Sequence, residues 1–105
     1  MSFTGNEDHS ISLSKAAEFT ANYRQSAGQG AIIAGYFGET TLKNILNQDG
    51  CVGIRFYYGL DNNGDPKMVL VGADTDENDL IDGIIAEKSY PCPPYCSKQN
   101  QLNSN

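Results

Sequence analysis

Two cysteines near the end of the chain have the types and spacing of metal ligands. Cys92 and Cys96 are separated by Pro-Pro-Tyr, and Cys51 and His9 are the only other Cys and His residues. Four such side chains are the ligand set of a tetrahedral zinc site. However, Cys51 starts a predicted strand and His9 lies in the polar start of the chain. We therefore expect no metal or other cofactor. The sequence does not decide whether the sulfurs of Cys92 and Cys96 are metal-bound, bridged or free.

A disulfide between Cys92 and Cys96 is the second chemistry to weigh. The two prolines between them favour a polyproline II conformation, which rises ~3.1 Å per residue and would hold the two Cα atoms ~12 Å apart. A bridge requires a separation below about 7 Å, so only a tight turn would permit it. An odd number of cysteines and a start without a secretory signal are typical of a reducing compartment. We expect reduced thiols in a cytoplasmic protein.

Two acidic stretches, residues 61–65 and residues 74–79, resemble the start of a calcium-binding loop. An EF-hand loop has glycine at its sixth position and glutamate at its twelfth. The sixth position is Pro66 in the first stretch and Asp79 in the second, and neither stretch has the final glutamate. Ordinary turn chemistry explains both stretches without an ion.

Catalysis and nucleic-acid binding have little support in the sequence. The only histidine, His9, precedes every predicted rigid element, and no glycine-rich phosphate loop follows a strand. The net charge is −6, with no basic stripe for phosphate groups and no run of ~18 apolar residues. We expect a protein that is not an enzyme and that binds neither nucleic acid nor membrane.

The first half of the chain predicts two or three short helices. Ser12 or Ser14 is a suitable N-cap for a helix over residues 15–24. The short apolar segment 31–38 is interpreted as a helical segment. Residues 39–47 follow as a further helix, which Thr40 or Thr41 would cap. The expected core positions of the two longer helices are Ala16, Phe19, Thr20, Tyr23, Leu42, Ile45 and Leu46.

The second half predicts a β-hairpin. Residues 51–58 and 67–74 are rich in β-branched and aromatic side chains and flank Asn63-Gly64, the strongest short signal for a hairpin turn. A two-residue type I′ turn there would place Arg55 opposite Gly72, with Asp74 diagonal to Arg55. We therefore predict an Arg55–Asp74 ion pair. The same register predicts an apolar face made by Tyr58 opposite Val69, Phe56 opposite Val71, Ile54 opposite Ala73, and a second face with Tyr57 opposite Leu70.

A third strand over about residues 84–90 would complete an antiparallel meander, which Pro91 would end. The expected fold is therefore α+β, with two to three short helices packed on a three-stranded sheet. Residues 1–105 are expected to form a single domain. Residues 1–11 and 97–105 are polar and are expected to be loosely ordered.

The chain resembles a family of small uncharacterised proteins from Bacteroidetes-type bacteria. The resemblance is carried by GCVGIRFYYG at residues 50–59, by residues 69–74 and 78–80, and by CPPYC at residues 92–96. It implies a bacterial origin, and it implies no activity because none is established for that family.

The polar face of the predicted hairpin is the candidate binding surface. It holds Arg55, Tyr57 and Asp74, and Tyr95 from the C-terminal segment is added to it. Tyrosine and arginine are enriched in protein interfaces. We expect a non-catalytic module that binds a protein partner or a second copy of the chain. The alternative is a small metal- or thiol-dependent protein that uses Cys92 and Cys96.

Overall fold

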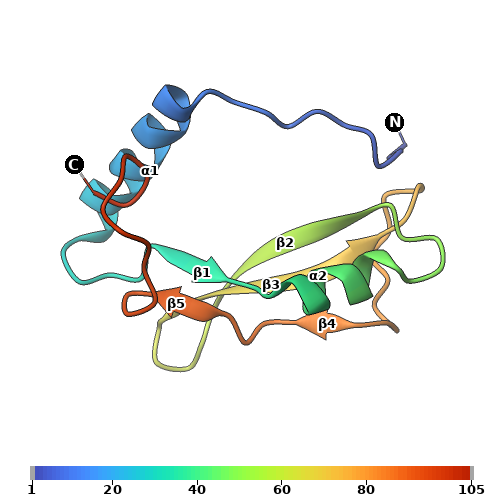
Figure 1. Ribbon diagram of the computed structural model, residues 1–105. Coiled ribbons are helices and arrows are strands. Elements are labelled where there is room, and N and C mark those ends of the chain that lie inside the picture. Colours follow the sequence, from blue (N-terminus) through green and yellow to red (C-terminus); the bar gives the residue numbers. More distant parts are fainter. Residues whose placement is uncertain (1, 105) are drawn as a thin grey trace. The chain divides into compact units, whose positions relative to one another are not determined.

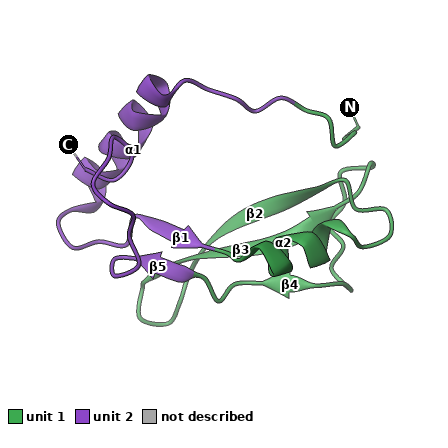
Figure 2. Cartoon of the chain, viewed as in Figure 1, with its two compact units in different colours: residues 1–7, 37–89 green, residues 8–36, 90–105 purple. Residues whose placement is uncertain are grey.

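The computed structural model describes residues 2–104, which form two compact units (Figure 2). Unit 1 comprises residues 1–7 and 37–89, and unit 2 comprises residues 8–36 and 90–105. The predicted α+β class is confirmed, since the described residues contain two α-helices and a three-stranded antiparallel sheet. The single domain over the whole chain stays a prediction.

The sheet of unit 1 has the strand order β2-β3-β4 (Figure 1). Strands β2, Gly53–Leu60, and β3, Pro66–Ala73, form the predicted hairpin, and β4, Ile85–Ala86, pairs with the other side of β3. The predicted third strand over residues 84–90 is wrong in extent, because its pairing with β3 covers two residues. Its last residue, Tyr90, belongs to another strand.

The register of the hairpin differs by one residue from the predicted one. Arg55 faces Val71 rather than Gly72, and Phe56 faces Leu70 rather than Val71. Every predicted cross-strand pair is therefore wrong. Because side chains alternate between the two faces of a strand, the shift moves Leu70 to the face that carries Phe56.

A three-residue loop between Asp61 and Asp65 causes the shift. The N–H of Asp61 donates to the carbonyl oxygen of Asp65 at 3.0 Å, and the N–H of Gly64 donates to that of Asp61 at 3.0 Å. Gly64 has a φ of 82°, as a type I turn followed by a glycine bulge requires. The Asp61 carboxylate also accepts from the N–H groups of Asn63 and Asp65, both at 2.9 Å. These bonds favour the longer loop over the two-residue turn.

Helix α2, Glu39–Leu46, confirms the second predicted helix. Its N-cap is Gly38, which makes no side-chain hydrogen bond, so the predicted cap by Thr40 or Thr41 is wrong. Both threonines lie inside the first turn. Lys43 pairs with Glu39 one turn earlier at 3.1 Å.

The core of unit 1 lies between α2 and the middle strand β3. Ile45 of α2 and Leu70 of β3 are fully buried. Gly72 lies on the same face of β3 as Leu70. A side chain at Gly72 would meet Nε2 of Gln48 at 3.1 Å and Sγ of Cys51 at 2.9 Å. The end of α2 therefore packs directly on this face, and glycine leaves room for it.

Unit 2 begins with helix α1, Leu13–Ala27. The predicted cap by Ser12 is confirmed, since its hydroxyl accepts from the N–H of Lys15 at 3.1 Å. The predicted buried stripe is wrong, because no residue of α1 is buried and Phe19 and Tyr23 are about half exposed. Since none of its residues is buried, α1 receives little stabilisation from packing, and an isolated helix of this length is marginal in water.

Unit 2 also contains a two-stranded sheet in which β1, Ala34–Tyr36, pairs with β5, Tyr90–Cys92. The N–H of Ile33 extends this pairing with a bond to the carbonyl oxygen of Cys92 at 2.8 Å. The helical interpretation of residues 31–38 is therefore wrong. The strand forms against a segment near the other end of the sequence, which a local pattern does not reveal.

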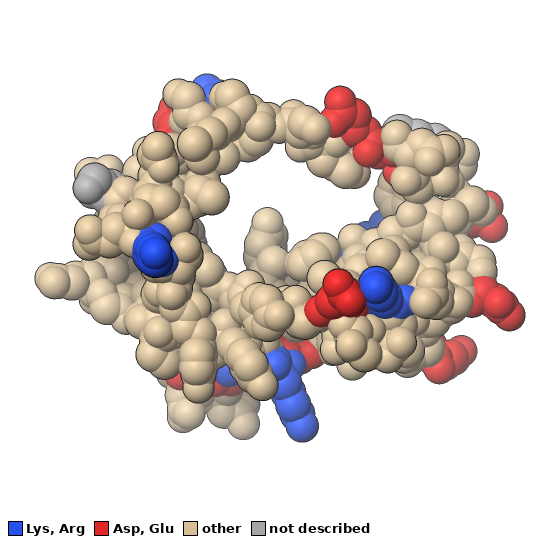
Figure 3. Space-filling view, in the orientation of Figure 1, with Lys and Arg blue, Asp and Glu red and all other residues tan. Residues whose placement is uncertain are grey.

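Charge is divided unevenly between the two units. Unit 2 has only two acidic residues, Asp8 and Glu18, so the other acidic residues of the chain belong to unit 1. The face in Figure 3 shows more acidic side chains over unit 1 than over unit 2. No helix within residues 2–104 is long and apolar enough to cross a membrane.

Candidate functional site

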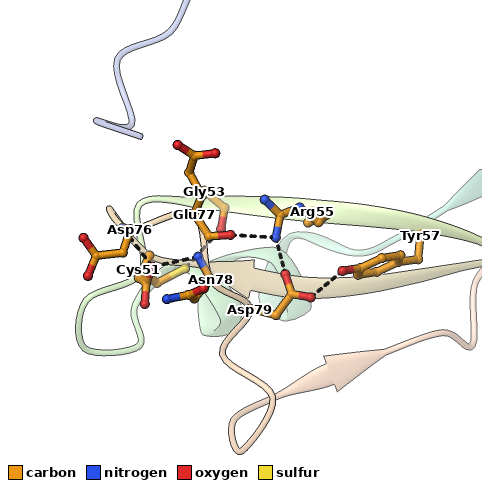
Figure 4. Close-up of polar contacts among 9 residues, drawn as sticks. Cys51, Gly53, Arg55, Tyr57, Asp76, Glu77, Asn78 and Asp79 are labelled. Atoms are coloured by element: carbon orange, nitrogen blue, oxygen red, sulfur yellow. Dashed lines mark hydrogen bonds and ion pairs between the residues drawn. The ribbon is translucent and has the colours of Figure 1, made fainter. Parts of the chain in front are cut away.

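A polar cluster joins β2 to the loop after β3 (Figure 4). Arg55 and Tyr57 lie two residues apart on β2 and therefore share a face. Nη1 of Arg55 donates to Oδ1 of Asp79, and the hydroxyl of Tyr57 donates to Oδ2 of the same carboxylate. Nη1 of Arg55 also donates to the carbonyl oxygen of Glu77 at 3.1 Å. The side chains of Arg55 and Asp79 are 30% and 19% exposed, so the ion pair is largely shielded from water.

The hydrogen bonds of Asp79 fix the protonation of the cluster. The bond from Tyr57, followed by the bond and charge of Arg55, lowers the pKa of the Asp79 carboxyl below its ordinary value of 3.8. The same bond to Asp79 raises the pKa of the Tyr57 hydroxyl. At neutral pH the carboxylate is ionised and the phenol is protonated. A carboxylate with a lowered pKa is a weak general base, so the cluster suits a positioning role better than proton transfer.

Asp74 is engaged in a turn, and the predicted Arg55–Asp74 ion pair is wrong. The carboxylate of Asp74 accepts from the N–H groups of Asp76 and Asn78, both at 2.9 Å. The N–H of Glu77 donates to the carbonyl oxygen of Asp74 at 3.1 Å. Of the three residues predicted for this face, the structure therefore brings Arg55 and Tyr57 together and holds the Asp74 carboxylate in the turn.

The Asp74 turn repeats the hydrogen-bond pattern of the Asp61 turn. Glu77, with a φ of 70°, takes the left-handed position that Gly64 takes in the first turn. The turn directs the carbonyl of Glu77 and the carboxylate of Asp79 toward Arg55. Sequence reasoning did not predict that Asp79 is the partner of Arg55. The only signal for it is that an aspartate begins each acidic stretch, which is typical of a turn.

Phe3 is a further residue that sequence reasoning missed. The guanidinium of Arg55 lies 5.6 Å from the centroid of the Phe3 ring, a cation–π distance. The N–H of Phe3 donates to the carbonyl oxygen of Thr75 at 3.1 Å. Arg55 is therefore held by an aromatic ring as well as by the carboxylate.

Strand β2 is an edge strand. Within the sheet of residues 53–86, β2 pairs with β3 alone. Asp61 and Asp65 form a hydrogen-bonded pair, and such pairs alternate with non-bonded pairs along an antiparallel ladder. The register then fixes which N–H and C=O groups of β2 point away from β3. They belong to Ile54, Phe56, Tyr58 and Leu60.

Three of these four residues also expose apolar side chains. Phe56 is 48% exposed, Tyr58 is 91% exposed and Leu60 is 74% exposed. Natural proteins usually protect an exposed edge with lysine, proline or a bulge. β2 has none of these devices, and its one charged residue, Arg55, is bound to Asp79. The opposite edge, β4, is only 2 residues long.

Tyr95, the remaining predicted binding residue, belongs to unit 2. Its ring centroid lies 5.3 Å from that of Tyr90, which lies 6.1 Å from that of Tyr36. All three rings are largely exposed. They form a row of tyrosines along the β1–β5 sheet and the turn that follows it.

Cys92 and Cys96 are joined by a disulfide, with their Cα atoms 4.8 Å apart. The expectation of reduced thiols is therefore wrong for this pair, as is the extended geometry expected for residues 93–94. Both peptide bonds before the two prolines are cis. The chain turns so tightly that the N–H of Tyr95 donates to the carbonyl oxygen of Pro91 at 2.9 Å.

The third cysteine, Cys51, has a free, half-buried thiol. Its Sγ donates to the carbonyl oxygen of Gly53 at 3.2 Å. Because the bridge occupies the sulfurs of Cys92 and Cys96, only Cys51 of the three candidate metal-binding cysteines keeps a free thiol. Across residues 2–104, no three His, Cys, Asp or Glu side chains gather where they could hold a metal ion.

Comparisons with known proteins add no assignment to this geometry. No protein-family model matches the chain, and no curated protein and no solved structure matches it.

Proposed function

We propose that the chain is a non-catalytic protein-interaction module that binds through the outer edge of β2. The observation that supports this proposal best is that three of the four residues of β2 with outward backbone groups, Phe56, Tyr58 and Leu60, also have exposed apolar side chains. An extended segment that adds to such an edge gains backbone hydrogen bonds and side-chain contacts together.

The Arg55–Asp79–Tyr57 cluster supports this role by fixing β2 on one face. Its bonds connect the strand to the loop after β3, so the edge is ordered before a partner arrives. An edge that is already ordered loses less conformational entropy on binding. The acidic excess of unit 1 disfavours nucleic acid and anionic membranes as partners.

The proposal can be tested with a photo-reactive aromatic residue placed at position 58. Position 36 is a matched control, since Tyr36 is another exposed tyrosine on a strand. We expect adducts to form from position 58, to map to the outer edge of β2, and to be lost in Leu60→Pro. That substitution removes an outward N–H and no bond to β3. Two outcomes would contradict the proposal. One is that positions 58 and 36 form equal amounts of adduct, and the other is that position 58 forms no adduct either in the purified protein or in host extract.

The alternative function, a thiol-dependent protein, rests on the Cys92–Cys96 bridge. Cys96 is exposed and Cys92 is buried, so a dithiol reductant would reach Cys96 first. Titration of thiols before and after reduction tests it, and a bridge that stays closed in the presence of a dithiol argues against it. The cytoplasmic location and the bacterial origin stay predictions, and the bridge weighs against a reducing compartment.

A further inference from the structure

We infer that the partner of the β2 edge is a second copy of this chain, bound antiparallel through its own β2. This inference rests on the proposed function and names the occupant of its site. It follows from the register of the hairpin, from the side chains that would face each other, and from the placement of charge.

The backbone of β2 selects one register for two copies. Only residues 54, 56, 58 and 60 have groups that point outward, so these residues must face each other across the new ladder. All four are used when Ile54 faces Leu60 of the second copy and Phe56 faces Tyr58 of the second copy. A shift by two residues in either direction leaves at least one outward residue without a counterpart. The two-fold axis then passes beside Tyr57.

The side chains of this register are complementary. Phe56 would pack against Tyr58 of the second copy, and symmetry repeats this aromatic pair. Ile54 would pack against Leu60 of the second copy on the same face. Cross-strand pairs of aromatic and aliphatic side chains are favourable in antiparallel sheets. The pairing would cover the three exposed apolar side chains on this face of β2, which are Phe56, Tyr58 and Leu60.

The charges of this register do not oppose one another. Arg55 would face Gly59 of the second copy, and Asp61 would face Gly53 of the second copy. Asp61 of the second copy would also lie diagonal to Arg55 on the same face, so opposite charges would be neighbours there while Arg55 stays bound to Asp79 of its own copy. Two acidic copies can therefore meet along this strand, which bears one arginine and no carboxylate.

The assembly would also leave the sheet without a long unpaired edge strand. Joining two copies through β2 gives a continuous six-stranded sheet whose outer edges are the short β4 strands. Short edge strands are one of the ways in which proteins avoid further pairing. The association would then stop at a dimer.

Sedimentation velocity of the full chain tests the oligomeric state. We expect a dimer for the wild type and for Tyr36→Thr, the matched control. Tyr58→Pro removes an outward N–H from each copy without touching the bonds to β3, and should raise the dissociation constant by about tenfold to a hundredfold. Tyr58→Thr keeps the N–H and should weaken the dimer less than Tyr58→Pro.

Cysteine cross-linking tests the register in a Cys51→Ser background. Tyr57→Cys would place two sulfurs beside the two-fold axis at a non-bonded pair, where Cα atoms lie about 4.5 Å apart and a disulfide forms readily. Tyr58→Cys would face Phe56 of the second copy and should cross-link poorly. Efficient cross-linking at 58 but not at 57 would overturn this register.

The outcomes separate the two proposals. A wild type that remains monomeric at roughly millimolar concentration, well above the Kd of a specific complex, overturns the second copy as partner. If position 58 then forms edge-specific adducts with a different protein, the interaction module stands and only this inference fails. If no adduct forms, both proposals fail.

Discussion

Reduction of the Cys92–Cys96 disulfide should loosen unit 2 while unit 1 stays folded. Among the described residues, Cys92 is the one buried hydrophobic side chain that unit 2 contributes. The β1–β5 sheet pairs 3 residues of each strand. A unit of this size with so little buried apolar surface depends on a covalent staple.

The magnitude follows from the length of the closed loop. The cysteines are 4 residues apart in sequence, so the bridge closes a very short loop. The chain-entropy relation gives a stabilisation of about 2 kcal/mol for a loop of this length at 25 °C. This free energy corresponds to roughly a 30-fold change in the equilibrium between closed and open unit 2.

Amide hydrogen exchange with and without a reductant measures the effect. The N–H of Ile33 reports on unit 2 through its bond to Cys92, and the N–H of Leu80 reports on unit 1 through its bond to the Gly72 carbonyl at 2.9 Å. We expect exchange at Ile33 to accelerate about 30-fold on reduction and exchange at Leu80 to stay constant. Cys51→Ser should respond like the wild type. An unchanged rate at Ile33, or equal acceleration at Leu80, would refute the reasoning.

Three further changes test the remaining contacts. Asp79→Asn should make the stability of unit 1 depend less on pH in the acid range. Because the pKa of Asp79 is lowered in the folded state, the stabilisation by its carboxylate is complete above pH 3.8 and is lost as the pH falls through the folded pKa. Urea midpoints measured between about pH 2 and pH 6 detect the difference from the wild type. Leu70→Ala should lower the free energy of unfolding of unit 1 by about 3 kcal/mol in urea titrations, whereas the exposed Ile85→Ala should cost under about 1 kcal/mol. Ser12→Ala should destabilise α1 by about 1 kcal/mol and accelerate exchange of the Lys15 amide; an unchanged rate would remove Ser12 as the cap.

The elements that the sequence predicts well are those whose signals are local. The cap at Ser12, the helix over residues 39–46 and the two long strands each depend on residues within one short window. The helix periodicity and the β-branched runs encode these elements directly. The α+β class follows from their order along the chain.

The features that the sequence does not predict depend on distant residues. Residues 34–36 become a strand only because residues 90–92 pair with them. Asp79 reaches Arg55 only because the turn after Asp74 has the shape that it has. A local window contains neither partner, so the pattern there supports more than one conformation.

The hairpin loop shows how one residue changes the surface that the protein offers. In a two-residue turn at residues 63–64, the hydrogen-bonded pairs would include positions 56 and 58, and the outward groups would belong to Arg55, Tyr57 and Gly59. The Asp61 carboxylate and the left-handed Gly64 favour the three-residue loop instead. The outward groups then belong to Ile54 and to three residues with exposed apolar side chains, Phe56, Tyr58 and Leu60, while Arg55 and Tyr57 stay bonded to Asp79. The interaction surface proposed for β2 therefore depends on the turn at its end.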